Sequence, residues 1–153
     1  MAKFNVQGSS DFEMRLSRLA DPEVSKRVVN AGAQPVADEI RKGLETNIRD
    51  LESVSKNPSN ETALFKTGLS SGNLLDALGI APSDIDYDGC TNTKVGFDGY
   101  DEKGVPNQLK ARVMESGSSR IRKRPFIRPA IKRSQNRAIE AMKDQFKKET
   151  ENS

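Results

Sequence analysis

Apolar residues four and eight positions apart across residues 24–48 constrain the fold of this chain most strongly. Such spacing places a single apolar stripe along an α-helix. The stripe comprises Val24, Val28, Val36, Ile40, Leu44 and Ile48. Asp21 and Pro22 suit the N-cap and the first helical position, whereas Pro35 inside the run should kink or split the helix. We therefore expect a long, bent amphipathic helix that ends near Leu51.

Two shorter elements are expected before this helix. Phe4 and Val6 alternate with polar residues, which predicts a short strand. Ser10 and Glu13 have the spacing of a capping box, in which each side chain bonds the other residue's backbone N–H, and this pattern predicts a short helix.

A hairpin and a further helix are expected in the middle of the chain. Residues 80–87 and 93–97 predict two strands, and the Asp88-Gly89 pair between them suits a tight turn. Pro106 at a first turn and Gly117 just beyond a last turn then bracket a helix.

The last predicted helix starts around Pro129. Its apolar stripe is expected to comprise Ile131, Ala138, Met142 and Phe146. Residues 149–153 are expected to fray. Together these elements predict an α+β fold, in which a small, mostly antiparallel sheet is packed by the long bent N-terminal helix and the C-terminal helix. A single domain over residues 1–148 suits a chain of 153 residues.

The amino-acid composition excludes several kinds of chemistry. The chain has no histidine, which rules out Ser-His-Asp and Cys-His arrangements, His proton shuttles and His metal ligands. Cys90 is the only cysteine, which excludes an internal disulfide and a cysteine-rich zinc site. We therefore expect no catalytic residue, no cofactor and no bound metal. No apolar run approaches the roughly 18–20 residues that span a bilayer, and the N-terminus lacks the apolar core of a signal peptide, so no membrane partner is expected.

Positive charge gathers in the C-terminal part of the chain. Residues 120–153 contain 11 Lys and Arg against 4 Asp and Glu, whereas residues 1–119 contain 14 against 18. The densest run comprises Arg120, Arg122, Lys123, Arg124 and Arg128. Such a run can form a charged protein–protein interface, an ordinary solvated surface or a direct contact with DNA phosphates. DNA is the least favoured of the three, because no aromatic stacking platform or known nucleic-acid motif surrounds the run.

The spacing Asp84-x-Asp86-x-Asp88-Gly89 matches the first half of a calcium-binding loop. The twelfth position of such a loop supplies a bidentate Glu, and here it is Val95. A strand explains the same spacing, since its side chains alternate between two faces and would place the aspartates together on one of them. The strand is the favoured interpretation.

Glu115 differs from the other carboxylates because it lies one turn from the basic run, in the segment Ala111-x-x-x-Glu115-x-Gly117-Ser118. An ion pair or hydrogen bond that holds the following loop is favoured over catalysis. Pro125 and Pro129 restrict the backbone on either side of Phe126, which is therefore expected to act as a buried staple.

Three segments resemble the tail-component family of lambdoid long-tailed phages, which comprises neck, head–tail joining and tail-completion proteins. Ser71-Gly72-Asn73-Leu74-Leu75 matches the family's small residue followed by Gly-Asn-Leu. Ala111-x-x-x-Glu115-x-Gly117-Ser118 matches its next segment, and Pro125-Phe126-Ile127-Arg128-Pro129-Ala130 matches the start of its last helix. Lys110 and Ser116 depart from the family, which commonly has Tyr and an aromatic residue there. The residues expected to be structural are Gly72, Leu74, Glu115, Gly117, Pro125 and Pro129.

The resemblance implies a structural protein of the virion, located at the head–tail junction and made in the host cytoplasm. It would form a ring, sixfold by analogy with the family, that completes the tail or neck and joins it to the head. The implied partners are other copies of the chain, head-completion proteins and tail-tube or terminator proteins, with packaged DNA nearby. The expected assembly surface comprises Arg120, Arg122, Lys123, Arg124, Phe126 and Arg128.

Two alternatives stay open at this point. Within the same class, the chain could be the tail-terminator ring that caps the tail tube. In a different class, it could be a DNA-binding module, which salt-sensitive affinity for duplex DNA would reveal. An enzyme is disfavoured, because the sequence offers no paired nucleophile and base.

Overall fold

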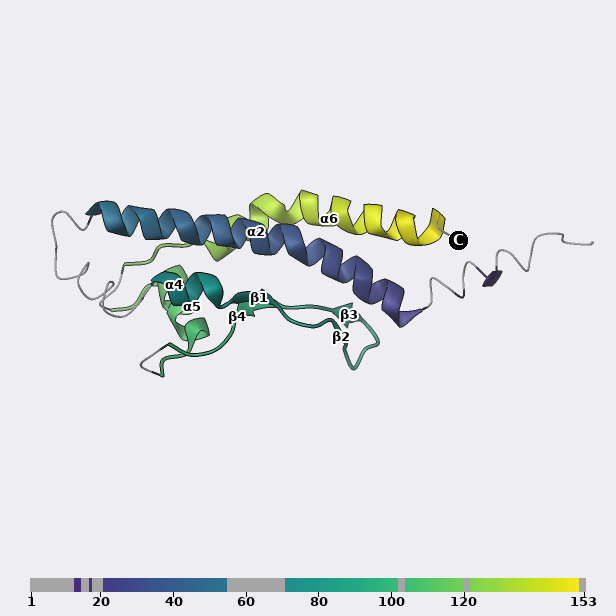
Figure 1. Ribbon diagram of the computed structural model, residues 1–153, viewed down its shortest axis with the longest axis horizontal. Coiled ribbons are helices and arrows are strands. Elements are labelled where there is room, and N and C mark those ends of the chain that lie inside the picture. Colours follow the sequence, from purple (N-terminus) through teal and green to yellow (C-terminus); the bar gives the residue numbers. More distant parts are fainter. Residues whose placement is uncertain are drawn as a thin grey trace, which may run out of the picture.

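The computed structural model describes residues 13, 14, 17, 21–54, 71–101, 104–119 and 122–151. They form an α+β fold, as the sequence predicts. Figure 1 shows α2 and α6 side by side along the molecule, with the strands, α4 and α5 against one side of α2. No helix in the described ranges is long and apolar enough to cross a bilayer. The order is α2 (Pro22–Val54), α4 (Ser71–Asp76), β1 (Leu78–Ile80), β2 (Asp84–Ile85), β3 (Thr91–Asn92), β4 (Val95–Phe97), α5 (Asn107–Ser116) and α6 (Ile127–Glu151).

Helix α2 begins where the sequence predicts. The Asp21 carboxylate accepts a hydrogen bond from the N–H of Glu23 at 3.0 Å, and Pro22 is the first helical residue. Pro35 lies inside the helix without ending it. Figure 1 shows α2 changing direction near its middle, so the expected bend is present and the helix is not split. The helix ends at Val54, slightly beyond the expected end.

Small residues on α2 allow α6 to pack closely against it. Ala33 and Ala37 are buried, and a β-carbon built on Gly32 would lie 2.6 Å from Cγ of Met142. The helices are antiparallel, because residues early in α2 meet residues late in α6. At their far ends, the Arg27 guanidinium donates two hydrogen bonds, at 2.7 and 2.9 Å, to the Glu149 carboxylate.

The strands form one interrupted antiparallel hairpin. Strand β1 pairs with β4, and β2 pairs with β3. Between the two pairs, the N–H of Ala81 donates to the Lys94 carbonyl at 2.8 Å, and the Thr93 hydroxyl donates to the Ala81 carbonyl at 2.6 Å. The expected hairpin is thus confirmed, but its strands are shorter than expected, because Pro82 has no N–H to continue the ladder.

One apolar cluster joins α2, α4, β1, α5 and the start of α6. Within this region the rings of Phe97 and Phe126 pack edge to face, with centroids 6.0 Å apart. The buried members of the cluster are Ile40, Leu44, Leu74, Leu78, Ala111, Met114, Phe126 and Ala130.

The apolar stripe predicted for α6 is wrong in part. Ile131 and Phe146 are 50% and 46% exposed, whereas Ala130 and Ser134 are fully buried. Helix α6 buries the small side chains Ala130 and Ser134, and further along it the absent side chain of Gly32 leaves space for Met142, a member of the predicted stripe.

Helix α6 continues to Glu151, into the segment 149–153 that the sequence predicts to fray, and residues 152 and 153 lie outside the described residues. Hydrogen bonds from Arg27 and Gln145 hold the Glu149 carboxylate and stabilise this last turn. The predicted strand at residues 4–6 lies outside the described residues. Of the short helix predicted from Ser10, residues 13, 14 and 17 are described, and all three are helical.

Gly32→Val should destabilise the protein, because the added side chain would overlap Met142 across the α2–α6 contact. Overpacking of this kind lowers the free energy of unfolding by about 1–3 kcal/mol. Urea unfolding followed by circular dichroism measures the change. Met142→Ala in the same chain should recover part of the loss, and a double mutant no more stable than Gly32→Val alone would contradict the contact.

Candidate assembly surface and the Glu115 cap

A carboxylate from α5 caps the N-terminus of α6. The two oxygens of Glu115 accept hydrogen bonds, at 2.7, 2.8 and 3.0 Å, from the backbone N–H groups of Phe126, Ile127 and Arg128. The next residue, Pro129, has no N–H to satisfy. Glu115 therefore supplies the acceptor for the free donors at the start of this helix. The predicted role of Glu115, a hydrogen bond that holds the following loop, is confirmed.

The cap favours the ionised form of Glu115. Partial burial, the largest single influence, raises the pKa of this carboxyl group, but the three N–H donors and nearby Arg128 together lower it by more. The positive end of the α6 dipole acts in the same direction as the donors. The net result is a pKa below the usual range, so the cap is strongest when Glu115 is charged.

The segment between α5 and α6 is tied to the core at both ends. Gly117 has a φ of +78°, and its N–H donates to the Val113 carbonyl at 2.8 Å, which ends α5. Near the other end, the N–H of Arg124 donates to the Met114 carbonyl at 2.7 Å. The side-chain amide of Asn47, on α2, donates to the Arg124 carbonyl at 3.1 Å.

The predicted assembly residues divide into exposed and buried ones. Arg122, Lys123 and Arg128 are exposed, and Arg124 is partly covered. Phe126 is only 2% exposed, so its assignment to a contact surface is wrong, whereas its role as a buried staple is confirmed. It anchors the segment from inside the core. Arg120 lies outside the described residues.

Of the residues predicted to be structural, Leu74 belongs to the buried cluster, and the others lie at or near helix ends. Leu74, from the first motif segment, is buried with Phe126 from the last one. Gly72 lies in the first turn of α4, and Gly117 ends α5. Pro125 is exposed beside the buried ring, and Pro129 lies in the first turn of α6.

A second carboxylate holds part of the basic face of α6. Glu39 on α2 is 9% exposed, and its oxygens lie 2.6 Å from Arg137, 3.1 Å from Arg133 and 3.4 Å from Lys42. Hydrogen bonds from Arg137 and then Arg133 are the main causes that lower the pKa of Glu39 to about 2. Two of the α6 cations are thus engaged inside the chain.

Sequence reasoning missed a buried ion pair beside this site. Lys110 Nζ lies 2.6 Å from an Asp101 oxygen, with side-chain exposures of 4% and 8%. The other Asp101 oxygen accepts the N–H of Val105 at 2.7 Å. A signal was present in the sequence, because Lys110 lies three residues after Asn107 and four before Met114, on the inward face of α5, where a lysine needs a partner.

The strand interpretation of the hairpin aspartates holds for Asp84 alone, because Asp86 and Asp88 lie beyond the strand, at the turn. Asp84 belongs to β2. The turn beyond it is closed by the N–H of Gly89, which donates to the Asp86 carbonyl at 2.9 Å and has a φ of +75°. In the part of the chain that the structure describes, no three Cys, Asp or Glu side chains gather to hold a metal ion.

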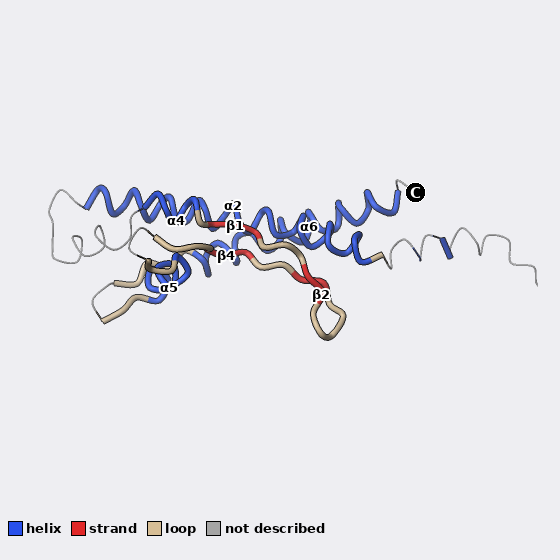
Figure 2. The backbone as a smooth tube through the Cα atoms, turned by 60° about the horizontal axis from the view of Figure 1, so that its bottom comes forward, coloured by secondary structure: helices blue, strands red, loops and turns tan. Residues whose placement is uncertain are grey.

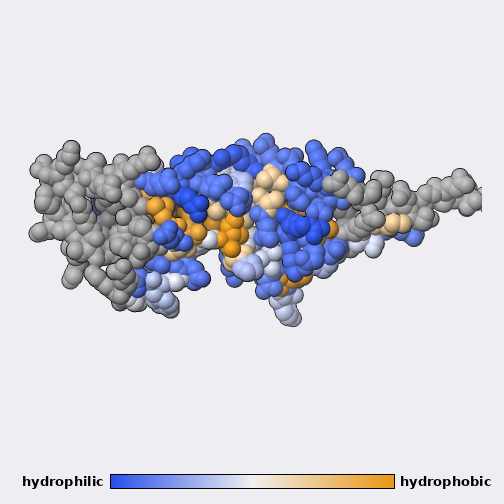
Figure 3. Space-filling model, viewed as in Figure 1, coloured by the Kyte–Doolittle hydropathy of each residue, from blue (hydrophilic) through white to orange (hydrophobic). Residues whose placement is uncertain are grey.

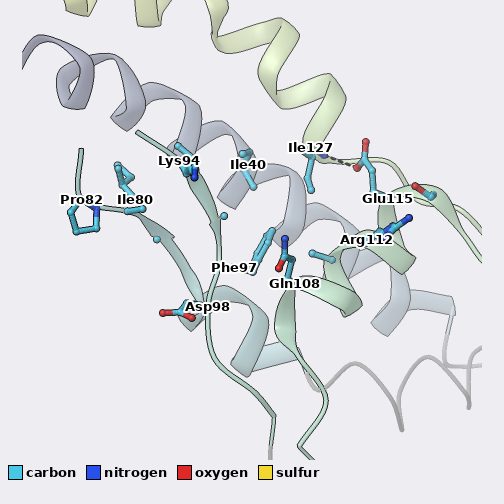
Figure 4. A pocket seen from close by; sticks show the side chains of 16 residues that line it. Ile40, Ile80, Pro82, Lys94, Phe97, Asp98, Gln108, Arg112, Glu115 and Ile127 are labelled. Atoms are coloured by element: carbon cyan, nitrogen blue, oxygen red, sulfur yellow. Dashed lines mark hydrogen bonds between the residues drawn. The ribbon is translucent and has the colours of Figure 1, made fainter. Parts of the chain in front are cut away.

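An open groove of about 700 Å³ lies between β4, α5 and the start of α6. Figure 4 shows side chains from α2, β4 and α6 meeting there, with Ile40, Phe97 and Ile127 forming part of its apolar lining. Lys94 and Arg112 add positive charge to the lining.

The groove also has two carboxylates, Asp98 and Glu115, and both already accept backbone N–H groups. Its lining therefore offers an apolar surface with cations beside it, and neither carboxylate is free of hydrogen bonds.

Comparison of the chain with family models, with curated proteins and with solved structures found no match.

Glu115→Ala should lower the free energy of unfolding by about 1–3 kcal/mol, because three N–H groups lose their acceptor. The difference from wild type should be full above the ordinary glutamate pKa of about 4.3 and should shrink as the pH falls. This sign follows because the folded pKa is depressed, so protonation removes the cap. Chemical unfolding across a pH series measures the effect. Glu140→Ala, at an exposed position on α6, is the control and should change little.

Glu39→Gln should make the melting temperature less dependent on pH in the acidic range. The pKa of Glu39 is depressed in the folded chain, so its contribution is present above about pH 4.3 and is lost as the pH falls to about 2. Melting temperatures measured between these values should decline less steeply in Glu39→Gln than in wild type. Arg137→Gln should flatten the same profile, since Arg137 is the main cause of the shift; a profile identical to wild type in both variants would contradict the network.

Proposed function

We propose that this chain is a structural virion protein of the phage head–tail junction, which forms a ring that completes the tail or neck and joins it to the head. The proposal starts from the resemblance of three motif segments to tail-component proteins. The observation that carries it is that these segments meet in one place. Leu74, Ala111 and Phe126, one from each segment, share a buried cluster. Glu115 then caps the helix that the third segment starts.

The packing of the three motif segments supports the proposal, because segments that define one fold are expected to contact one another. The first and last motif segments, residues 71–75 and 125–130, are separated by two strand pairs and a helix. Apolar residues of a small domain share one core in any case, so the Glu115 cap, which joins the second segment to the third, is the more specific contact between them. The three segments thus contribute to one unit formed by α4, α5 and the start of α6.

The exposed side of that unit supports a role in protein contacts. Arg122 and Lys123 project from a segment whose backbone is bonded to the core through Gly117 and Arg124. Such a segment is partly ordered before it binds, and this lowers the entropy lost on association. Acidic groups on a neighbouring subunit or neck protein are the partner chemistry that suits these cations.

The surface favours a protein partner over DNA. Arg133 and Arg137 are engaged by Glu39, which breaks the row of cations along α6. A DNA-binding module would need many phosphate contacts and would lose affinity steeply with salt. The tail-terminator ring is the alternative position in the same particle, and sixfold order rests on the resemblance alone.

Arg122→Glu combined with Lys123→Glu should block joining of heads to tails while leaving the chain folded. Reversal of exposed charges changes stability little, because such ion pairs contribute only about 0–1 kcal/mol. The matched control is Lys147→Glu with Lys148→Glu, which reverses two exposed charges at the distal end of α6. A thermal melt measures folding, and an in vitro head–tail joining assay with particles that lack the chain measures function.

Normal joining by the Arg122/Lys123 variant would remove this segment from the interface. Electron microscopy of joined particles provides the independent test of position. The proposal expects a ring of density for this chain at the junction, and particles that lack the chain but remain joined would overturn it.

A further inference from the structure

An exposed apolar tip and an open apolar groove occur on the same chain. Figure 2 shows the β2–β3 hairpin projecting from the body, and near its turn Tyr87 is 105% exposed and Ile85 is 42% exposed. Figure 3 shows hydrophobic atoms at the surface between α5 and this hairpin, where the outline of the molecule is notched. A fully exposed tyrosine and an unfilled groove are both typical of contacts that form only on assembly.

The tip is acidic, and the groove has two cations beside its two hydrogen-bonded carboxylates, Asp98 and Glu115. Asp86 and Asp88 flank Tyr87 at the tip, whereas Lys94 and Arg112 line the groove. None of these four side chains forms an ion pair within the described part of the chain. Opposite charges held on separate surfaces of one molecule favour contact between copies.

The tip and the groove are both suited to docking without rearrangement. The tip is closed by two backbone hydrogen bonds, from the Asp86 N–H to the Cys90 carbonyl at 2.8 Å and from the Gly89 N–H to the Asp86 carbonyl at 2.9 Å. In the groove, Gly79 and Gly96 face each other across β1 and β4, and β-carbons built on them would meet no atom within 4 Å. The space beside these strands is therefore open to a side chain from outside.

We propose that the hairpin tip of one copy docks into the groove of the next copy. Tyr87 and Ile85 enter the apolar part of the groove, and the tip aspartates lie near Lys94 and Arg112. The contact joins two different surfaces, so it is head-to-tail and can repeat until a ring closes. This inference rests on the proposed ring function and names the contact between its subunits.

Cysteine cross-linking tests the contact directly. The native Cys90 is exposed at the hairpin turn, and Gln108→Cys places a second thiol on α5 in the groove lining. A short bis-maleimide reagent should then produce a ladder of dimers, trimers and larger species on denaturing gels. The ladder is diagnostic when neither single-thiol chain, with Cys90 alone or with Gln108→Cys in a Cys90→Ser chain, gives dimers, because every link must then join the tip of one copy to the groove of another. The reaction is carried out on assembled particles and on the concentrated purified chain.

Three controls separate this contact from chance collisions. Gln108→Cys with Cys90→Ser removes the tip thiol and should abolish the ladder. Gln135→Cys, with Cys90 retained, places the new thiol on an exposed position of α6 instead and should give no ladder. Wild-type chain, with Cys90 alone, should give no dimer.

Three changes in the Gln108→Cys background test the chemistry of docking. Tyr87→Ala should reduce ladder yield roughly tenfold, as expected for an aromatic anchor in an interface. Gly96→Val should do the same by filling the groove, and a β-branched side chain suits a strand. Asp86→Lys with Asp88→Lys should also reduce the yield, and adding Lys94→Glu with Arg112→Glu should restore it.

The outcomes separate this inference from the proposed function. Junction particles that contain the chain but give no ladder would overturn the docking contact and leave the function in place. If the purified chain gives a ladder but the chain itself is absent from junction particles, the contact is supported and the proposed function is overturned. Dimers alone, formed through Cys90 of two copies, would indicate a symmetric tip-to-tip contact and would also overturn the docking.

Discussion

The hydrogen bonds from the start of α6 to Glu115 are the interaction on which the C-terminal half of the fold depends. They fix the direction in which α6 leaves the core, because one side chain on α5 receives three consecutive N–H groups. The buried ring of Phe126 then anchors the start of α6 in the core. These two contacts fix the C-terminal end of the basic segment between α5 and α6. Its cations are presented on a backbone held by the interior, as binding surfaces on loops commonly are.

The long helix pair extends this local arrangement along the molecule. Glycine and alanine on α2 bring α6 close, and the Glu39 and Glu149 carboxylates then meet arginines across the contact. Few large apolar side chains take part beyond the main cluster. The pairing of α2 with α6 is thus specified by close approach of the two backbones and by the positions of the charges. This explains how a chain with only 34% hydrophobic residues can form a long pair of helices.

The sequence predicts those parts of the fold that depend on neighbours along the chain. Asp21 and Pro22 mark the start of α2, Gly117 marks the end of α5, and Glu115 is recognisable as a loop-holding residue because it lies in the segment it serves. Contacts between distant segments could not be predicted in this way. The partner of Lys110 lies on a loop, and α6 buries Ala130 and Ser134 while the larger Ile131 and Phe146 stay exposed. Periodicity indicates that a helix has a buried face, but the opposing surface decides which residues belong to it.

The separation of contacts along the chain sets an order for folding during synthesis. The Glu115 cap joins residues only 11 to 13 positions apart, whereas the Arg27–Glu149 pair joins residues 122 positions apart. Local contacts form fast, and closing a long loop is slow because the entropy loss precedes the gain from contact. Helix α2 is made early, whereas α6 is the last of the described elements to be made. The side of α2 around Gly32, which meets α6, is therefore uncovered until α6 has emerged, and exposed surface of this kind favours association with other chains or with chaperones.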